Sequence, residues 1–184
     1  MDWPAIDELN TLAGEAFVEA LAPLFEGAPQ LLQRLAAERP FASDEAMLAM
    51  AREVAASTPE PDLLQLLDAH PRIGVEPAAM SALSRREQGG EAVDEAQEDP
   101  RTAVAVAEEL AALNEIYEAR FGFRYVVFVA GRPRAEIVPL MEVALRNDRE
   151  AELRRGVDEA IYIAADRLRR LRGVDPQPEQ EDEG

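Results

Sequence analysis

The sequence predicts a single all-α domain, a multi-helix bundle with one extended segment crossing it near residues 124–130. Three observations lead to this fold class. The 184-residue chain is 47% hydrophobic but only 5% aromatic, a balance typical of helical globular proteins. Apolar residues recur at helical spacing along most of the chain. The run YVVFVA, at residues 125–130, is the one strongly β-like stretch, and one strand cannot form a sheet. We therefore expect this run to be a buried extended segment.

The first half of the chain contains four segments with helix signals. Prolines and N-cap residue types mark their bounds, because proline begins a helix readily and cannot continue one. The predicted segments are residues 14–27, bent or shortened by Pro23, then 29–39, then 43–57 with Ser43 as N-cap, and then 58–70, ending at His70 before Pro71.

The second half is predicted to contain three longer helices. The first begins at Pro100 and ends before Gly122, the second begins at Pro133, and the third occupies residues 148–171 with Gly173 as its stop. Residues 72–100 are rich in glycine, proline and acids, which predicts a loop with one or two short helices. Residues 173–184 form an acidic, proline-containing tail that we expect to be disordered, so the predicted domain is residues 1–172.

Composition excludes several classes of function. The formal net charge of −18 repels phosphate backbones and anionic lipids, so we expect no nucleic-acid or membrane partner. The absence of cysteine excludes disulfides, thiolate metal sites and cysteine nucleophiles. No apolar run approaches the about 20 residues of a membrane span, and the N-terminus does not have the pattern of a signal peptide. The expected location is the cytoplasm.

The only histidine, His70, follows a run of leucines and precedes Pro71. Two interpretations remain open from the residues alone. A cationic imidazole near a helix C-terminus interacts favourably with the helix dipole and can bond the last carbonyls. Histidine is also the side chain whose proton moves near neutral pH, and the proline restrains the chain beside it, which favours acid/base catalysis.

Three other features have both a structural and a functional interpretation. Ser84 and Glu87 form the S-x-x-E pattern of a capping box, and a helix N-terminus is also an anion-binding position. The segment from Phe121 to Ala130 is typical of a core, yet an extended backbone without a sheet can offer its N–H and C=O groups to a ligand. Arg167 lies among several arginines, and periodicity alone does not place it inward.

Taken in order, these motifs resemble a known family. They are RPF at 39–41, HP at 70–71, S-x-x-E-Q at 84–88, Asn114 with Tyr117, RFGF at 120–123, Gly131, Arg146-Asn147 and Arg167-Leu168. This order resembles the decarboxylases of 2-oxo-4-hydroxy-4-carboxy-5-ureidoimidazoline (OHCU) over about residues 10–171. The resemblance implies an all-helical homodimer that converts OHCU to (S)-allantoin in urate degradation, with no metal or organic cofactor.

The resemblance also implies roles for individual residues. His70 and Glu87 match the catalytic pair, with Glu87 orienting the ring or carrying a proton. The residues implied to bind substrate are Pro71, Ser84, Gln88, Tyr125, Val126, Val127, Phe128, Val129 and Arg167. On this hypothesis His70 moves the substrate's hydroxyl proton or delivers a proton to one face of the ring, and Arg167 holds the carboxylate by a bidentate contact.

The sequence departs from the family pattern at three places that we expect to alter the lip of the pocket. Gln30 stands near a usual tryptophan, Arg124 stands where proline usually follows FGF, and the loop after Gln88 is longer. Other functions therefore stay open. The chain can be a non-catalytic helical protein that binds ureides or purine metabolites, a decarboxylase of a related ureido acid, or an acidic interaction protein without a pocket.

Overall fold

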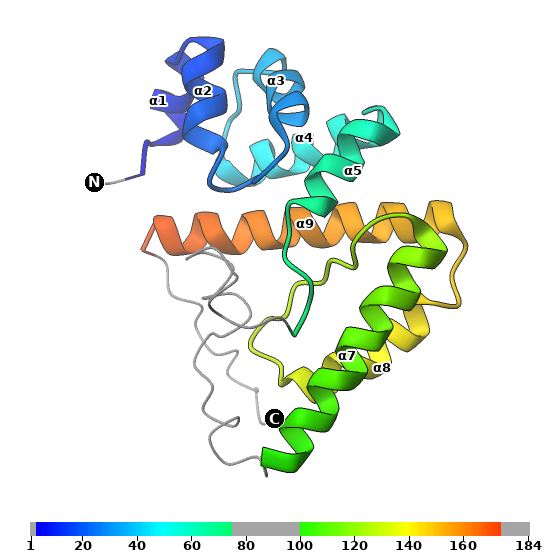
Figure 1. Cartoon of the computed structure of the whole chain (residues 1–184). Coiled ribbons are helices and arrows are strands. Elements are labelled where there is room, and N and C mark those ends of the chain that lie inside the picture. The colour runs from blue at the N-terminus through cyan, green and yellow to red at the C-terminus, as the bar shows by residue number, and fades with distance from the viewer. Residues whose placement is uncertain (1–2, 75–99, 174–184) are drawn as a thin grey trace, which may run out of the picture.

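The computed structural model describes residues 3–74 and 100–173, and every regular element in these two ranges is an α-helix (Figure 1). Within them no residue lies in a β-strand, which confirms the all-α fold class. The helices of the first range are α1 (Ile6–Thr11), α2 (Gly14–Leu21), α3 (Pro29–Ala37), α4 (Asp44–Ala56) and α5 (Glu60–Asp68). Those of the second are α7 (Pro100–Phe121), α8 (Arg134–Ala144) and α9 (Arg149–Leu171).

Helix α9 runs across the middle of the molecule, between the two groups of helices (Figure 1). Helices α4 and α5 pack against it from one side, while α7 and α8 pair with each other on the other side. Its buried apolar residues include a stripe with helical spacing, formed by Leu153, Val157, Ile161, Ala164 and Leu168. Since α9 is covered on more than one face, residues outside this stripe are buried as well.

Local signals set the helix bounds largely as predicted. The Ser43 hydroxyl accepts a hydrogen bond from the Ala46 amide at 3.2 Å, and Asp148 does the same for Ala151 at 2.8 Å. Helix α2 ends at Leu21, so Pro23 shortens the predicted segment. Gly122 follows α7 with a φ of +80°, a left-handed conformation that favours glycine.

Helix α3 ends at Ala37, two residues before the predicted end, and helix α5 also differs from its predicted segment. Helix α5 ends at Asp68 and not at His70, although the His70 amide still donates to the Leu67 carbonyl at 3.1 Å in a closing turn. Helix α1 was not predicted at all, because its six residues are too few to show a period. Residues 75–99, with the predicted loop and short helices, and the tail from residue 174 lie outside the described residues.

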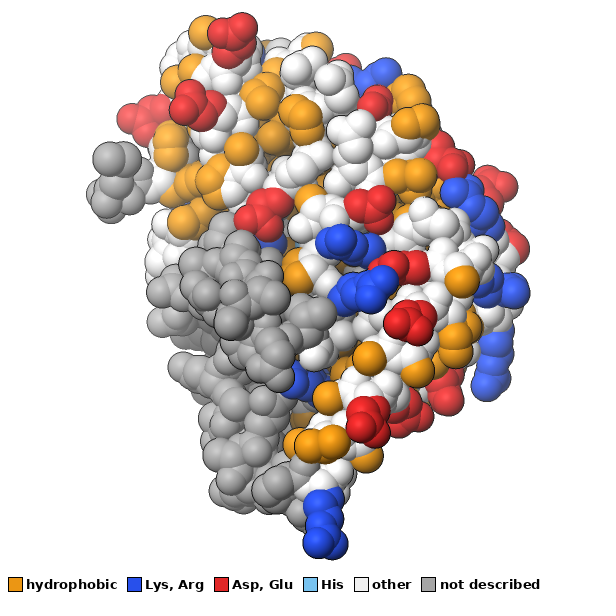
Figure 2. Space-filling model, viewed as in Figure 1, with side chains coloured by type: hydrophobic (Ala, Val, Ile, Leu, Met, Phe, Trp, Pro, Cys, Tyr) orange, Lys and Arg blue, Asp and Glu red, His pale blue; other side chains and the backbone are white. Residues whose placement is uncertain are grey.

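The segment after α7 is extended and buried, as predicted. Tyr125, Val126, Val127 and Val129 are all buried, and they cross beside the chain that leaves α5 (Figure 1). On the face shown in Figure 2, acidic and basic side chains are interspersed. Among the helices described, none is long and apolar enough to cross a membrane.

Candidate active site

A pocket lies between the turn that follows α5 and the extended segment that follows α7. The turn contributes His70, Pro71 and Ile73, and α9 contributes Ile163. The opposite wall consists of residues 125–129. The structure thus brings together seven of the predicted site residues, from positions more than fifty apart in the chain: His70, Pro71, Tyr125, Val126, Val127, Phe128 and Val129.

The His70 ring is held by the last turn of its own helix. Its Nδ1 atom lies 2.9 Å from the carbonyl oxygen of Leu66, four residues earlier. A carbonyl oxygen can only accept, so Nδ1 carries the proton and Nε2 of the neutral ring is an acceptor. Nε2 is buried and has no hydrogen-bond partner among the described residues. A buried acceptor of this kind is suited to take a proton from a ligand in the pocket.

The ring is neutral over the whole physiological range. Burial lowers the pKa of His70 to about 4, against the opposing effect of the bond to Leu66, and the positive charge of Arg167 lowers it further. The helix-cap interpretation is therefore right about the carbonyl bond and wrong about the charge. The ring is only 5% exposed, so the cost of burying a charged imidazole exceeds the gain from the helix dipole.

Charged side chains hold one side of the extended backbone. Arg155 Nη1 donates to the Val126 carbonyl at 2.9 Å, the Glu159 carboxylate accepts from the Phe128 amide at 2.7 Å, and Arg132 donates to the Phe128 carbonyl. Neighbouring residues of an extended chain direct their backbone groups to opposite sides. The N–H and C=O of Val127 therefore face the other way, and neither has a hydrogen-bond partner in the described part of the chain.

The Tyr125 side chain belongs to the core. Its ring packs edge-on against Tyr117 at 5.1 Å between centroids, and the Arg155 guanidinium lies 4.7 Å from its centroid. Burial raises the pKa of Tyr125 to about 12, so the phenol keeps its proton. The side chain of Tyr125 accordingly fixes the wall, and the backbone of the segment remains the part that can bind a ligand.

Arg167 is buried on α9 but is not one of the residues that line the described pocket. Its Nη1 donates to the carbonyls of Pro23 and Leu24, each at 3.2 Å, and its Nη2 lies 3.4 Å from the Glu26 carboxylate. The charge is nonetheless close enough to act on His70. Arg167 therefore joins α9 to the turn after α2 and adds positive potential beside the pocket.

Comparison with known proteins shows the family of this chain. The family model for OHCU decarboxylase matches residues 10–169. This chain belongs to the OHCU decarboxylase family. It is 34% identical to the 2-oxo-4-hydroxy-4-carboxy-5-ureidoimidazoline decarboxylase of Haloferax volcanii, over 89% of this chain and 93% of that one. It is 32% identical to the enzyme of the same name from Halalkalicoccus jeotgali, with 90% of each chain covered.

The fold also matches a solved member of the family. The crystal structure of an OHCU decarboxylase in the presence of (S)-allantoin superimposes with a TM-score of 0.65. The match covers 88% of this chain and 99% of that one, at 23% sequence identity. The arrangement of helices around α9 is therefore that of the OHCU decarboxylase fold.

Some family motifs hold the scaffold and do not reach the pocket. The Tyr117 hydroxyl and Asn147 Nδ2 donate to the two carboxylate oxygens of Glu152 at 2.6 and 2.8 Å. Glu152 is completely buried, and Arg155 Nε donates to it at 2.7 Å. The sequence analysis did not single out Glu152, which is one of several acids on α9. The nearby motif residues Tyr117 and Asn147 were the available signal.

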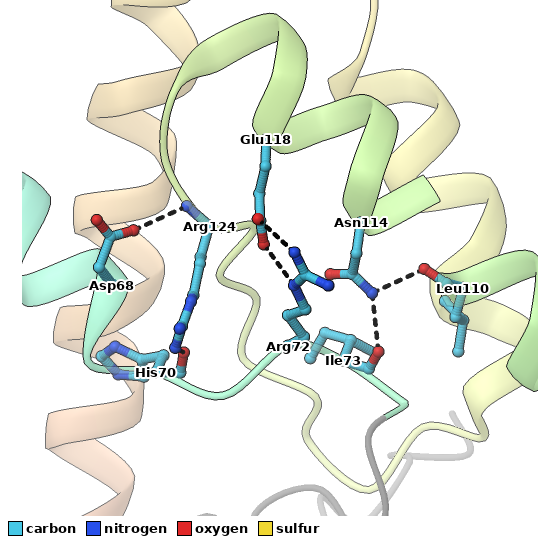
Figure 3. A network of polar contacts seen from close by, with 8 residues as sticks. All are labelled: Asp68, His70, Arg72, Ile73, Leu110, Asn114, Glu118 and Arg124. Atoms are coloured by element: carbon cyan, nitrogen blue, oxygen red, sulfur yellow. Dashed lines mark hydrogen bonds and ion pairs between the residues drawn. The ribbon is translucent and has the colours of Figure 1, made fainter. Parts of the chain in front are cut away.

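Three predicted residues of the OHCU decarboxylase site, Ser84, Glu87 and Gln88, lie outside the described residues, as does the longer loop after Gln88. The other two departures from the family pattern, Gln30 and Arg124, lie among the described residues. Gln30 is exposed on α3, and neither Gln30 nor Arg124 lines the described pocket. Arg124 instead bonds to the turn that carries His70, as Figure 3 shows.

Proposed function

We propose that this chain decarboxylates OHCU to (S)-allantoin in urate degradation, without a cofactor, and that His70 is its catalytic base. The observation that carries this proposal is the neutral, buried His70 with its unpaired Nε2 at a pocket whose opposite wall presents the Val127 backbone. Membership of the OHCU decarboxylase family, with relatives of that name over nearly their whole length, supports the same activity.

The chemistry removes one proton, from a hydroxyl, and adds one to a ring carbon and one to a ring nitrogen. Loss of carbon dioxide leaves an electron pair on the ring carbon that bore the carboxylate, and this pair spreads over the adjacent C=N group, whose nitrogen takes a proton from water. The hydroxyl on that carbon then loses its proton to become a carbonyl, while the neighbouring ring carbon gains a proton and becomes the stereocentre of allantoin. His70 Nε2 can accept the first proton and deliver the second to one face of the ring.

The remaining groups of the proposal bind and orient the substrate. Fixed backbone donors stabilise developing charge because they need no reorganisation during the reaction, and the Val127 amide is such a donor. Arg167 supplies positive charge for the carboxylate. We include Ser84, Glu87 and Gln88 as binding or orienting residues on the strength of the motif, together with Pro71 in the turn.

Assembly as a homodimer in the cytoplasm is part of this proposal. The resemblance to the OHCU decarboxylase family is the ground for the dimer, because the exposed apolar side chains Val104, Ile116 and Val143 are single residues that do not by themselves define an interface. Sedimentation equilibrium is expected to give twice the mass of the chain. A monomer at all concentrations contradicts this part of the proposal.

The test is the decay of freshly generated OHCU, followed by circular dichroism as (S)-allantoin forms. His70→Asn is the matched variant, because its amide nitrogen can keep the bond to Leu66 while the base at Nε2 is removed. We expect rapid decay with wild type and a loss of about 10²- to 10⁴-fold with the variant. Absence of acceleration by folded wild type overturns the decarboxylase proposal. Unchanged activity of His70→Asn overturns the role of His70 alone.

A non-catalytic binding protein gives a different result in the same preparation. Allantoin then raises the melting temperature of wild type through binding to the folded state, but OHCU decays no faster than without protein. That combination also contradicts the proposed function.

A further inference from the structure

Arg124 connects the two walls of the pocket without lining it. Its backbone amide donates to the Asp68 carboxylate at 3.1 Å, and its guanidinium Nη1 donates to the carbonyl oxygen of His70 at 2.9 Å (Figure 3). Asp68 is the last residue of α5, and Arg124 directly precedes the wall formed by residues 125–129. One bond thus joins the start of this wall to the end of α5, and the other joins it to the turn that carries His70.

The carbonyl of His70 depends on this contact for its hydrogen bond. It lies beyond the end of α5, where carbonyls have no partner within the helix. Among the described residues, Arg124 provides the one side-chain donor to this oxygen. A proline at position 124 has no backbone N–H and no side-chain donor, so it could form neither bond.

Two further contacts hold the same turn to α7. Arg72 forms a two-point ion pair with Glu118, with distances of 2.8 and 2.7 Å, and Asn114 Nδ2 donates to the Ile73 carbonyl at 2.9 Å (Figure 3). These contacts act on residues 72 and 73, beyond Pro71. Arg124 is the residue that acts on His70 itself.

We propose that Arg124 is a positioning residue, which sets the His70 ring relative to the backbone of residues 125–129 by bonding to the His70 carbonyl and the Asp68 carboxylate. This inference rests on the proposed function for its catalytic consequence. The physical reason is that proton transfer to one face of a ring requires base and binding wall to be held within a fraction of an ångström. The His70 amide is held by its bond to the Leu67 carbonyl, and Arg124 holds the carbonyl group of the same residue.

The test compares Arg124→Ala with Arg124→Lys and with the matched control Arg120→Ala. Arg120 also lies near the end of α7 and also donates to a backbone carbonyl, that of Asn147 at 3.3 Å, but it is not placed at the pocket. For Arg124→Ala we expect kcat to fall about 10- to 100-fold and the enantiomeric excess of allantoin to drop, with KM changed less. Arg124→Lys, which keeps a donor, is expected to recover part of both. Arg120→Ala is expected to change neither.

A second measurement does not depend on turnover. Because the chain has one histidine, the imidazole nitrogen NMR signals of the full chain without a histidine tag report His70 alone. We expect Arg124→Ala to shift or broaden these signals and to move the His70 titration midpoint towards its ordinary value. Arg120→Ala is expected to leave them as in wild type.

The outcomes separate this inference from the proposed function. Unchanged His70 signals together with unchanged enantiomeric excess in Arg124→Ala overturn the positioning role, and so does an equal effect of Arg120→Ala. If wild type does not convert OHCU, the proposed function fails, while the NMR comparison still decides whether Arg124 positions His70.

Discussion

Leu66 holds the His70 ring: the Nδ1 atom lies 2.9 Å from the Leu66 carbonyl oxygen, one helical turn earlier. This bond decides which ring nitrogen carries the proton, and burial decides that the ring is neutral. A group that at first resembles an ordinary helix cap is thereby converted into an acceptor at a pocket. The helix end and the proposed base are the same structural feature.

The acid limb of the activity is expected to reflect this neutral ring. Because the pKa of His70 is lowered to about 4, kcat/KM should stay high as the pH falls through 6.5 and decline only near the lowered value. The measurement is kcat/KM for OHCU decay as a function of pH, corrected for the spontaneous reaction. A limb centred near 6.5 would contradict a buried neutral base.

Stability should depend on pH through the same group. The unfolded chain protonates His70 near pH 6.5 and the folded chain only near 4, so protons bind preferentially to the unfolded state between these values. The free energy of unfolding is therefore unaffected by His70 above pH 6.5 and falls as the pH falls below it, by roughly 2 kcal/mol at about pH 5. Urea unfolding of wild type and His70→Asn at both ends of this range checks it. A difference between the two proteins that does not vary with pH contradicts the shift.

Tyr117→Phe is expected to lower the free energy of unfolding by about 1–3 kcal/mol. The change removes one donor to the completely buried Glu152 carboxylate and leaves that oxygen with fewer partners. Chemical denaturation followed by far-UV circular dichroism measures the loss. Tyr162→Phe is the matched control, since Tyr162 is half exposed on the same helix as Glu152, and it should change stability by no more than about 0.5 kcal/mol.

Glu159→Ala is expected to raise KM for OHCU and to have only a small effect on the melting temperature. The carboxylate accepts from the Phe128 amide at 2.7 Å, so its loss frees one side of the wall whose other side is proposed to bind substrate. Glu159→Gln keeps an acceptor oxygen and should lie between wild type and Glu159→Ala. Steady-state kinetics of the three proteins test this order, and an unchanged KM in Glu159→Ala would count against it.

Arg167→Lys is expected to lose stability as well as activity. Lysine keeps the charge but cannot reach the Pro23 and Leu24 carbonyls with a fork of donors, so the turn after α2 loses its bonds to α9. Thermal unfolding should shift downwards, and kcat/KM should fall even at temperatures where the variant is fully folded. If Arg167→Lys is less stable but has the kcat/KM of wild type, Arg167 has a structural role alone.

The sequence was sufficient for most of the helices because their bounds depend on neighbouring residues. Ser43, Asp148, Pro29 and Gly122 act through caps, a fixed φ or a left-handed conformation, and each of these is a local property. The ordered motifs were also sufficient for the family. Helix α1 was not predicted because six residues are too few to show a helical period.

Tertiary structure alone decided which charged residues are buried and which groups meet. Arg167 and Glu152 do not lie on the apolar stripe of α9, and they are buried because helices cover α9 on more than one face. His70 is neutral because the pocket walls remove water from it, an effect of segments distant in the chain. Arg124 faces the His70 carbonyl only once α5 and α7 have packed. Caps and periods are short-range and visible in a sequence, whereas burial and charge depend on long-range packing.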